Sequence, residues 1–181
     1  MIILASQSPR RKELLSMCGF EFEIKPAEAD ETLPDGISPA DAVEYLSRIK
    51  AEAIDDDENI IIGADTVVAL GNEILGKPSD DEDAFRMLSA LSGKIHSVFT
   101  GVTLRKKDKL ITFHCETKVE FYEMTEEEIR GYIATKEPND KAGAYAIQGI
   151  GGLFIKGISG DYNNVVGLPV AELLRKIKEL M

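Results

Sequence analysis

Apolar residues along the chain occur in short runs and in periodic stripes, which predict alternating strands and helices. The run Ile60-Ile61-Ile62 continues into Val67 and Val68 and is typical of a strand buried on both faces. Residues 1–5 predict a shorter first strand, and the alternation over 20–27 predicts a second. We therefore expect 59–78, which contains the apolar run, to form the centre of a sheet.

Capping residues mark where helices begin. Ser8 precedes Pro9 at a helix start, and Ser38-Pro39 begins a second helix that we expect to run to about residue 54. The remaining helices are predicted to start at Ser79 or Asp80, at the capping box of Thr125, and at Pro169.

Between these helices the pattern changes to a period of two over 95–124, which predicts a long antiparallel hairpin. Gly71-Asn72 predicts a tight turn after the central strand. The fold class is therefore α/β, a mixed central sheet flanked by helices. With 181 residues, the hairpin can belong to a second lobe or extend the same sheet. We treat 1–181 as a single domain whose two lobes surround one cleft.

Composition and charge exclude several classes of protein. The net charge of −11 argues against a nucleic-acid polymer as partner, because such binding requires Lys and Arg to neutralise phosphates. No apolar run reaches the roughly 18 residues of a membrane span, and 1–5 is too short for a signal peptide. Cys18 and Cys115 are far apart, and the two histidines complete no zinc-ligand pattern. We expect a cytoplasmic protein with reduced thiols.

Asp65 is the anomaly of the central strand. A carboxylate in an apolar strand costs several kcal/mol unless a cation, a metal or hydrogen-bond donors meet it. Small neighbours leave space beside it, and Lys77 follows on the turn Gly76-Lys77-Pro78. One interpretation is a site of Asp65, a metal, a phosphate and Lys77. The other is a structural aspartate that caps a turn.

Basic residues at the first predicted helix point to an anion. Arg10 and Arg11 fall in its first turn, where the helix dipole disfavours cations. An anion held by backbone N–H groups, by the hydroxyls of Ser6 and Ser8 and by arginine would explain this placement. The alternative is a basic turn that faces solvent.

Three further positions and one segment carry open alternatives. Lys50 lies on or beside the apolar stripe of the second helix, so it either extends to solvent or points toward a ligand. Glu31 belongs to an acidic cluster that is either a solvated loop or a Mg²⁺ or Mn²⁺ site. Asp80 is either only a helix cap or a neighbour of Lys77 in one site. The glycine-rich segment 136–167 is either a set of flexible connecting loops or backbone that approaches a ligand.

Several motifs in order together resemble the Maf family over essentially the whole chain. They are Leu4-Ala5-Ser6-Gln7-Ser8-Pro9-Arg10-Arg11-Lys12-Glu13-Leu14-Leu15, Gly63-Ala64-Asp65-Thr66-Val67-Val68, Gly76-Lys77-Pro78, Lys141-Ala142-Gly143-Ala144-Tyr145-Ala146-Ile147-Gln148-Gly149 and Val166-Gly167-Leu168-Pro169. The resemblance implies a house-cleaning nucleoside triphosphate pyrophosphatase, with a fold related to the inosine triphosphate pyrophosphatases. It also implies a divalent cation and a homodimer.

Within that family, Ala144-Tyr145-Ala146-Ile147-Gln148-Gly149 resembles the dTTP/UTP branch and not the branch that acts on 7-methyl-GTP. The resemblance makes Asp65 the proton acceptor and associates Arg10, Thr66 and Gln148 with substrate choice. It also places other positions at the site. These are Arg11, Glu31, Lys50, Lys77 and Asp80.

The residue types fit hydrolysis of a phosphoanhydride, which needs neutralised phosphates and a positioned water. Asp65 with Glu31 would hold the metal, or Asp65 would take the proton of the water. Gln148 can offer both a donor and an acceptor to a pyrimidine. A nucleotide-binding regulator of cell division is the main competing function. A phosphatase with an aspartyl nucleophile fits poorly, because Val67 stands where a second aspartate is expected.

Overall fold

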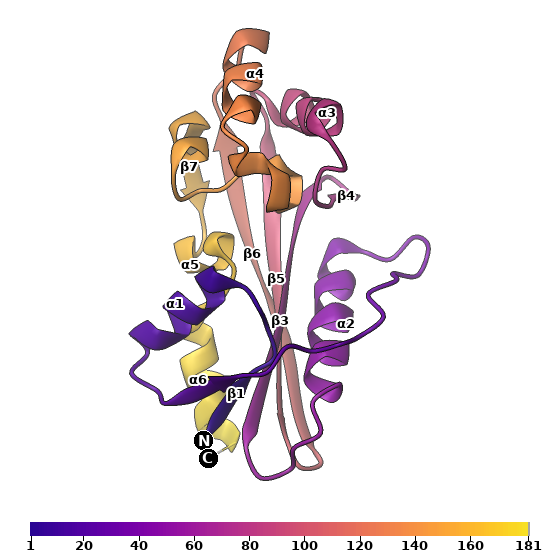
Figure 1. Cartoon of the computed structure of the whole chain (residues 1–181), viewed down its shortest axis with the longest axis vertical. Coiled ribbons are helices and arrows are strands. Elements are labelled where there is room, and N and C mark those ends of the chain that lie inside the picture. The colour runs from indigo at the N-terminus through magenta and orange to yellow at the C-terminus, as the bar shows by residue number, and fades with distance from the viewer. Residues whose placement is uncertain (181) are drawn as a thin grey trace.

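A long twisted sheet runs through the molecule in the computed structural model, which describes residues 1–180 (Figure 1). Its strands are β1 (Ile2–Leu4), β2 (Phe22–Ile24), β3 (Ile60–Leu70), β4 (Glu73–Leu75), β5 (Ile95–Lys106), β6 (Lys109–Phe121) and β7 (Ile155–Ser159). They lie in the order β2-β1-β3-β5-β6-β7, and β4 pairs with β3. β1 is parallel to β2 and β3, whereas all other pairs are antiparallel. The predicted mixed sheet is confirmed.

The predicted hairpin over 95–124 does not form a separate sheet. β5 pairs with β3 along nearly its whole length, so that Asp65 lies opposite Gly101. β6 then pairs with β5. Because these three strands are long, they connect the two ends of the molecule in Figure 1. The hairpin is thus an extension of the central sheet that also reaches into the upper end.

All the α-helices except α5 begin within one residue of where the sequence predicted them. They are α1 (Pro9–Met17), α2 (Pro39–Glu52), α3 (Asp81–Leu91), α4 (Glu126–Ala134), α5 (Tyr162–Val166) and α6 (Val170–Leu180). Ser8 and Ser38 cap α1 and α2 with their side chains, Asp80 caps α3, and Thr125 forms the predicted capping box with Glu128. Over residues 1–180, no helix has the length and apolar character needed to span a bilayer.

Glycine lets α2 approach one face of the sheet very closely. A Cβ on Gly63 would lie 2.1 Å from the backbone oxygen of Ser47, and a Cβ on Gly101 would lie 2.2 Å from that of Val43. Ser47 and Val43 both belong to α2. This contact brings the last turns of the helix, which include Lys50, against the middle of β3. The two glycines therefore determine how far Lys50 is from the sheet.

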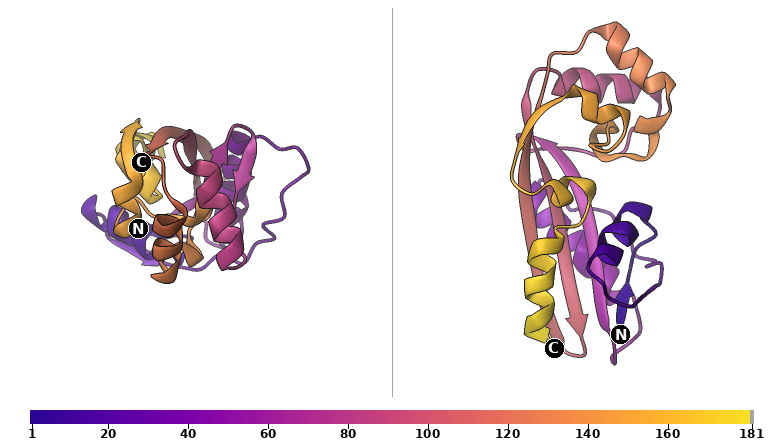
Figure 2. Two further views of the ribbon diagram at one scale, coloured as in Figure 1. Left: turned by 90° about the horizontal axis from the view of Figure 1, so that it is seen from above. Right: turned by 90° about the vertical axis from the view of Figure 1, so that its left-hand side faces the viewer.

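The opposite face of the sheet is covered by α1, α5 and α6, as the side view in Figure 2 shows. Buried side chains there form one apolar core, with Leu15, Ile62 and Leu173 fully enclosed. A second core lies at the far end of the long strands under α3 and α4, and includes Leu88 and Phe121. The two cores define two lobes that share β3, β5 and β6.

The glycine-rich segment carries more regular structure than the sequence indicated. It contains short 3-10 helices over Glu137–Asp140, Ala142–Ala144 and Ile150–Phe154, followed by β7 and α5. Gly143 has a φ of 67° and packs directly on Val68, which leaves no space for a Cβ. Close packing against Val68, and not a flexible loop, therefore explains why a glycine occupies position 143.

His96 is a buried histidine in the second core. It is 2% exposed, its Nε2 lies 2.7 Å from the Tyr145 hydroxyl, and its ring packs edge-on against Phe121. Within residues 1–180 its Nδ1 has no hydrogen-bond partner. Burial lowers the pKa of His96 from 6.5 to about 4, so the ring is neutral near pH 7.

This burial predicts a loss of stability in mild acid. Between pH 6.5 and 4 the unfolded chain binds a proton that His96 in the folded chain does not, so the free energy of unfolding falls as pH falls. We expect a loss of about 3 kcal/mol across that window, which His96→Phe should remove. Urea denaturation at pH 7, 6, 5 and 4.5 measures it. His114→Gln, at an exposed histidine, is the control, and an equal slope in His96→Phe and wild type would contradict the assignment.

Candidate active site

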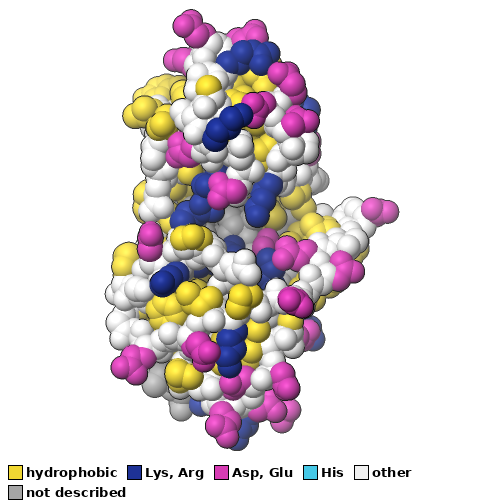
Figure 3. Space-filling view, in the orientation of Figure 1, with side chains coloured by type: hydrophobic (Ala, Val, Ile, Leu, Met, Phe, Trp, Pro, Cys, Tyr) yellow, Lys and Arg dark blue, Asp and Glu magenta, His cyan; other side chains and the backbone are white. Residues whose placement is uncertain are grey.

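A cleft of about 1030 Å³ lies between the two lobes. In Figure 3 it is the hollow at mid-height of the molecule, and Lys and Arg side chains surround it. Its walls come from the turn before α1, from α2, from the middle of β3, from the turn after β4 and from 140–148. Segments far apart in the sequence therefore meet at one place.

The floor of the cleft carries a carboxylate that is paired with a lysine. Lys50 Nζ lies 2.5 Å from Asp65 Oδ1 and 3.2 Å from Glu31 Oε1. The Lys50 and Asp65 side chains are only 12% and 15% exposed, whereas Glu31 is open to solvent. The cost of a charge in an apolar strand is thus offset by an ion pair with α2. Lys50 points toward the cleft and does not extend to solvent.

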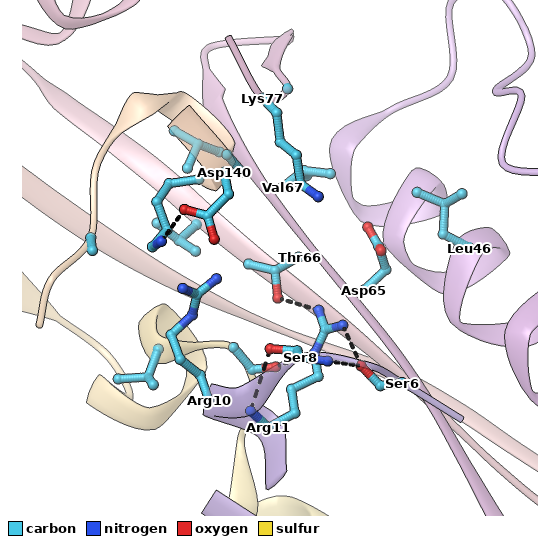
Figure 4. Close-up of a pocket in the computed structure, with 18 of the residues that line it drawn as sticks. Ser6, Ser8, Arg10, Arg11, Leu46, Asp65, Thr66, Val67, Lys77 and Asp140 are labelled. Atoms are coloured by element: carbon cyan, nitrogen blue, oxygen red, sulfur yellow. Dashed lines mark hydrogen bonds and ion pairs between the residues drawn. The ribbon is translucent and has the colours of Figure 1, made fainter. Parts of the chain in front are cut away.

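Arg11 connects the α1 turn to the sheet. Its Nε donates to the Gly167 carbonyl at 2.9 Å, one terminal nitrogen donates to Thr66 Oγ1 at 3.0 Å, and the other donates to Ser6 Oγ at 3.4 Å (Figure 4). Burial lowers the pKa of Arg11, and the nearby Asp65 carboxylate opposes that shift. The guanidinium is therefore fixed beside Asp65.

The remaining cations lie around the upper part of the cleft. Arg10 and Lys77 both line it, and Figure 4 shows the Lys77 side chain directed toward its centre. Lys141 lines the same wall and forms an ion pair with Asp140. With no acidic residue in the first turn of α1, this region holds a concentration of positive charge in an acidic protein.

The segment that carries Gln148 is held from both sides. The Tyr132 hydroxyl accepts a hydrogen bond from the Ala146 amide at 3.2 Å, and Glu137 accepts one from the Ile150 amide at 3.1 Å. Gln148 itself is exposed and lines the cleft. Gln148 therefore lies on the wall of the cleft in a segment whose backbone is anchored to the upper lobe.

The structure brings nearly all of the predicted site residues together. Those that line the cleft are Ser6, Ser8, Arg10, Arg11, Glu31, Lys50, Asp65, Thr66, Lys77 and Gln148. Asp80 is not among the lining residues, and its carboxylate accepts from the Asp83 amide and caps α3; its contribution to the site stays a prediction. Asp140 and Lys141 line the cleft and were missed, although Lys141 opens the glycine-rich motif that indicated a ligand.

This arrangement can bind a ligand with several negative charges and can activate a polar group beside Asp65. Arginines and lysines at separate points of the wall suit an extended polyanion better than a single small anion. Asp65 and Glu31 supply carboxylate oxygens on one side of that path, with Lys50 between them. Fold and site together define a mixed α/β protein with a polyanion-binding, carboxylate-bearing cleft.

Comparison with known proteins agrees with this class. The family model described as Maf-like protein matches residues 1–180, and the chain belongs to the Maf family. A Bacillus cereus protein named dTTP/UTP pyrophosphatase is 52% identical over 180 residues, which are 98% of this chain and 89% of that protein. A Bacillus cytotoxicus protein of the same name is 53% identical over 179 residues, with 98% and 94% covered.

Solved structures of lower similarity include two Ham1 proteins. The Staphylococcus aureus Ham1 protein is 16% identical with a TM-score of 0.49, and the match covers 66% of this chain and 71% of that one. The Coxiella burnetii HAM1 protein is also 16% identical, with a TM-score of 0.43 and coverage of 66% and 72%.

Proposed function

We propose that this protein is a nucleoside triphosphate pyrophosphatase that converts dTTP and UTP to the monophosphate and pyrophosphate. The observation that carries the proposal is the Asp65–Lys50 ion pair, which lies in one cleft with the Arg10–Arg11 turn. Relatives at 52–53% identity over nearly the whole chain bear the name dTTP/UTP pyrophosphatase. The similarity over nearly the whole chain, the cleft and the charges in it are thus all consistent with pyrophosphatase activity.

The residues of the cleft take different roles in the hydrolysis. Arg10, Arg11 and Lys77 neutralise the phosphates, which leaves pyrophosphate as a stabilised leaving group. Asp65 orients the attacking water or accepts its proton, and the hydrogen bond from Lys50 holds the Asp65 carboxylate in place. Gln148 hydrogen-bonds the pyrimidine from the anchored upper wall of the cleft.

A divalent cation, Mg²⁺ or Mn²⁺, is part of the proposal. Asp65 and Glu31 both contact Lys50 Nζ, so their carboxylates converge on the same part of the cleft. Over residues 1–180 there is no cluster of three metal-ligating side chains. Two carboxylates nevertheless fit Mg²⁺, which usually takes one or two protein carboxylates together with substrate phosphates and waters. When bound, the ion would neutralise phosphate charge and lower the pKa of a bound water.

A nucleotide screen scored by pyrophosphate release tests the function. We expect release from dTTP and UTP with Mg²⁺ or Mn²⁺, with UMP as the second product of UTP, and a loss of release in excess chelator. Purine triphosphates and 7-methyl-GTP serve as the specificity controls. Preference for 7-methyl-GTP would assign the chain to the other branch, and nucleotide binding without turnover would favour a regulator of cell division.

Two further properties belong to the proposal. A cytoplasmic location agrees with Cys18 and Cys115, which are both free thiols and lie in different parts of the fold. Burial raises the pKa of Cys115 to about 11, so this thiol is unreactive near neutral pH. The homodimer implied by the family resemblance stays a prediction.

A further inference from the structure

Arg11 is the end, at the cleft, of a chain of hydrogen bonds that leads to buried groups. Its guanidinium donates to Thr66 Oγ1 at 3.0 Å, Thr66 Oγ1 lies 2.9 Å from Thr100 Oγ1, and Thr100 Oγ1 lies 2.9 Å from the Asn164 carbonyl. Thr100 is 0% exposed and lies opposite Thr66 in the β3–β5 register. This chain of hydrogen bonds thus runs from the cleft across β3 and β5 to α5.

The direction of each proton in this chain follows from the acceptor at its end. The Asn164 carbonyl can only accept, so Thr100 must donate its one hydroxyl proton there. Thr100 then has only lone pairs for Thr66, and Thr66 must donate its own proton to Thr100. Thr66 Oγ1 in turn is left as an acceptor, which is what Arg11 needs.

Two consequences concern the ligand. Thr66 has no proton to offer, so it does not hydrogen-bond a phosphate oxygen, which is itself only an acceptor. Arg11 has five N–H groups, three of which donate to Gly167, Ser6 and Thr66, so two remain for the ligand. The neighbours of Arg11 determine where those two point.

We propose that Thr100 is a positioning residue for the triphosphate site: it fixes the Thr66 hydroxyl as an acceptor and thereby orients Arg11 toward the phosphates. Thr66 then influences substrate binding through Arg11 and not by direct contact with a phosphate. The inference rests on the proposed function, because it assumes that the cleft binds a triphosphate. The inference adds to the proposed site a buried residue, Thr100 on β5, that does not itself line the cleft.

The test compares Thr100→Val with Thr100→Ser, which keeps the hydroxyl, and with Thr103→Val. Thr103 is a matched control because it is also 0% exposed on β5 and bonds two hydroxyls, those of Ser47 and Thr112. We expect Thr100→Val to raise KM for UTP and Kd for inorganic tripolyphosphate about three- to tenfold, the range for one neutral hydrogen bond. Thr100→Ser and Thr103→Val should bind as wild type does.

A double-mutant cycle separates positioning from a general loss of stability. In an Arg11→Ala background, Thr100→Val should have no further effect on tripolyphosphate binding, because the chain acts only through Arg11. Equal binding by Thr100→Val and Thr103→Val, or an undiminished effect in Arg11→Ala, would overturn the proposal. Calorimetry with tripolyphosphate needs no turnover, so the expected pattern without UTP hydrolysis would refute the activity alone. Absence of tripolyphosphate binding by wild type would refute the positioning role as well.

Discussion

Asp65→Asn is expected to lower the rate of pyrophosphate release from UTP by about a hundred- to ten-thousandfold, the range typical of a lost general base. The substitution keeps the shape of the side chain and removes its charge. Lys50 then faces a neutral amide oxygen in place of the carboxylate at 2.5 Å, and Glu31, at 3.2 Å, remains as its only carboxylate among the described residues. Both the proton acceptor and one of the proposed metal ligands disappear together.

The fold should survive this change, because Asp65 contributes no apolar packing to either core. Asp57→Asn is a matched control: it removes a carboxylate 3.1 Å from Arg105, beyond the end of α2 and outside the cleft lining. Circular dichroism should be unchanged in both variants, while only Asp65→Asn loses activity. Turnover within a factor of about three of wild type would remove Asp65 from the mechanism, because one lost neutral hydrogen bond alone has that effect.

The same variant distinguishes the two roles left open for Asp65. If the residue acts mainly as a metal ligand, raising the Mg²⁺ concentration restores part of the rate, because weaker affinity is compensated by mass action. If it acts as the proton acceptor, the rate is restored by raising pH and not by Mg²⁺. Glu31→Gln, which leaves the Lys50–Asp65 pair intact, provides the reference for loss of one ligand alone.

Local physical chemistry explains why much of the site was visible in the sequence. Asp65 stood out because a charge in an apolar strand is costly, and Arg10 and Arg11 because cations oppose the helix dipole. Each violates a rule of stability, and each lies in the cleft. The capping residues Ser8 and Ser38 were equally readable, because a cap is a local interaction within one turn.

The other features of the site depend on contacts between segments that are far apart in the sequence, and no local pattern predicts such contacts. The spacing of Asp80 to Lys77 left open whether Asp80 is only a helix cap, and the structure shows the cap of α3. Lys141 reaches the cleft only because Gly143 packs on Val68, 75 positions earlier in the chain. Thr100 resembles any other threonine on a strand until the β3–β5 register places it opposite Thr66.

Gly101→Ala is expected to destabilise the fold and disable the site in one step. The new Cβ would lie 2.2 Å from the Val43 oxygen and 2.8 Å from the Glu44 nitrogen, which are backbone atoms of α2. Backbone cannot rotate away as a flexible side chain does, so α2 must move off the sheet. We expect the free energy of unfolding to fall by about 3 kcal/mol, at the upper end of overpacking effects. Lys50, carried on the same helix, would then be displaced from Asp65.

Chemical denaturation and pyrophosphate release from UTP, measured on the same samples, check both parts of this prediction. Gly157→Ala is the matched control: it also adds a methyl group to a strand glycine, but no atom lies within 4 Å of the new Cβ. Gly63→Ala, whose Cβ would lie 2.1 Å from the Ser47 oxygen, should reproduce the defect of Gly101→Ala from the neighbouring strand. If Gly101→Ala were as stable and active as Gly157→Ala, close approach of α2 could not be what places Lys50 beside Asp65.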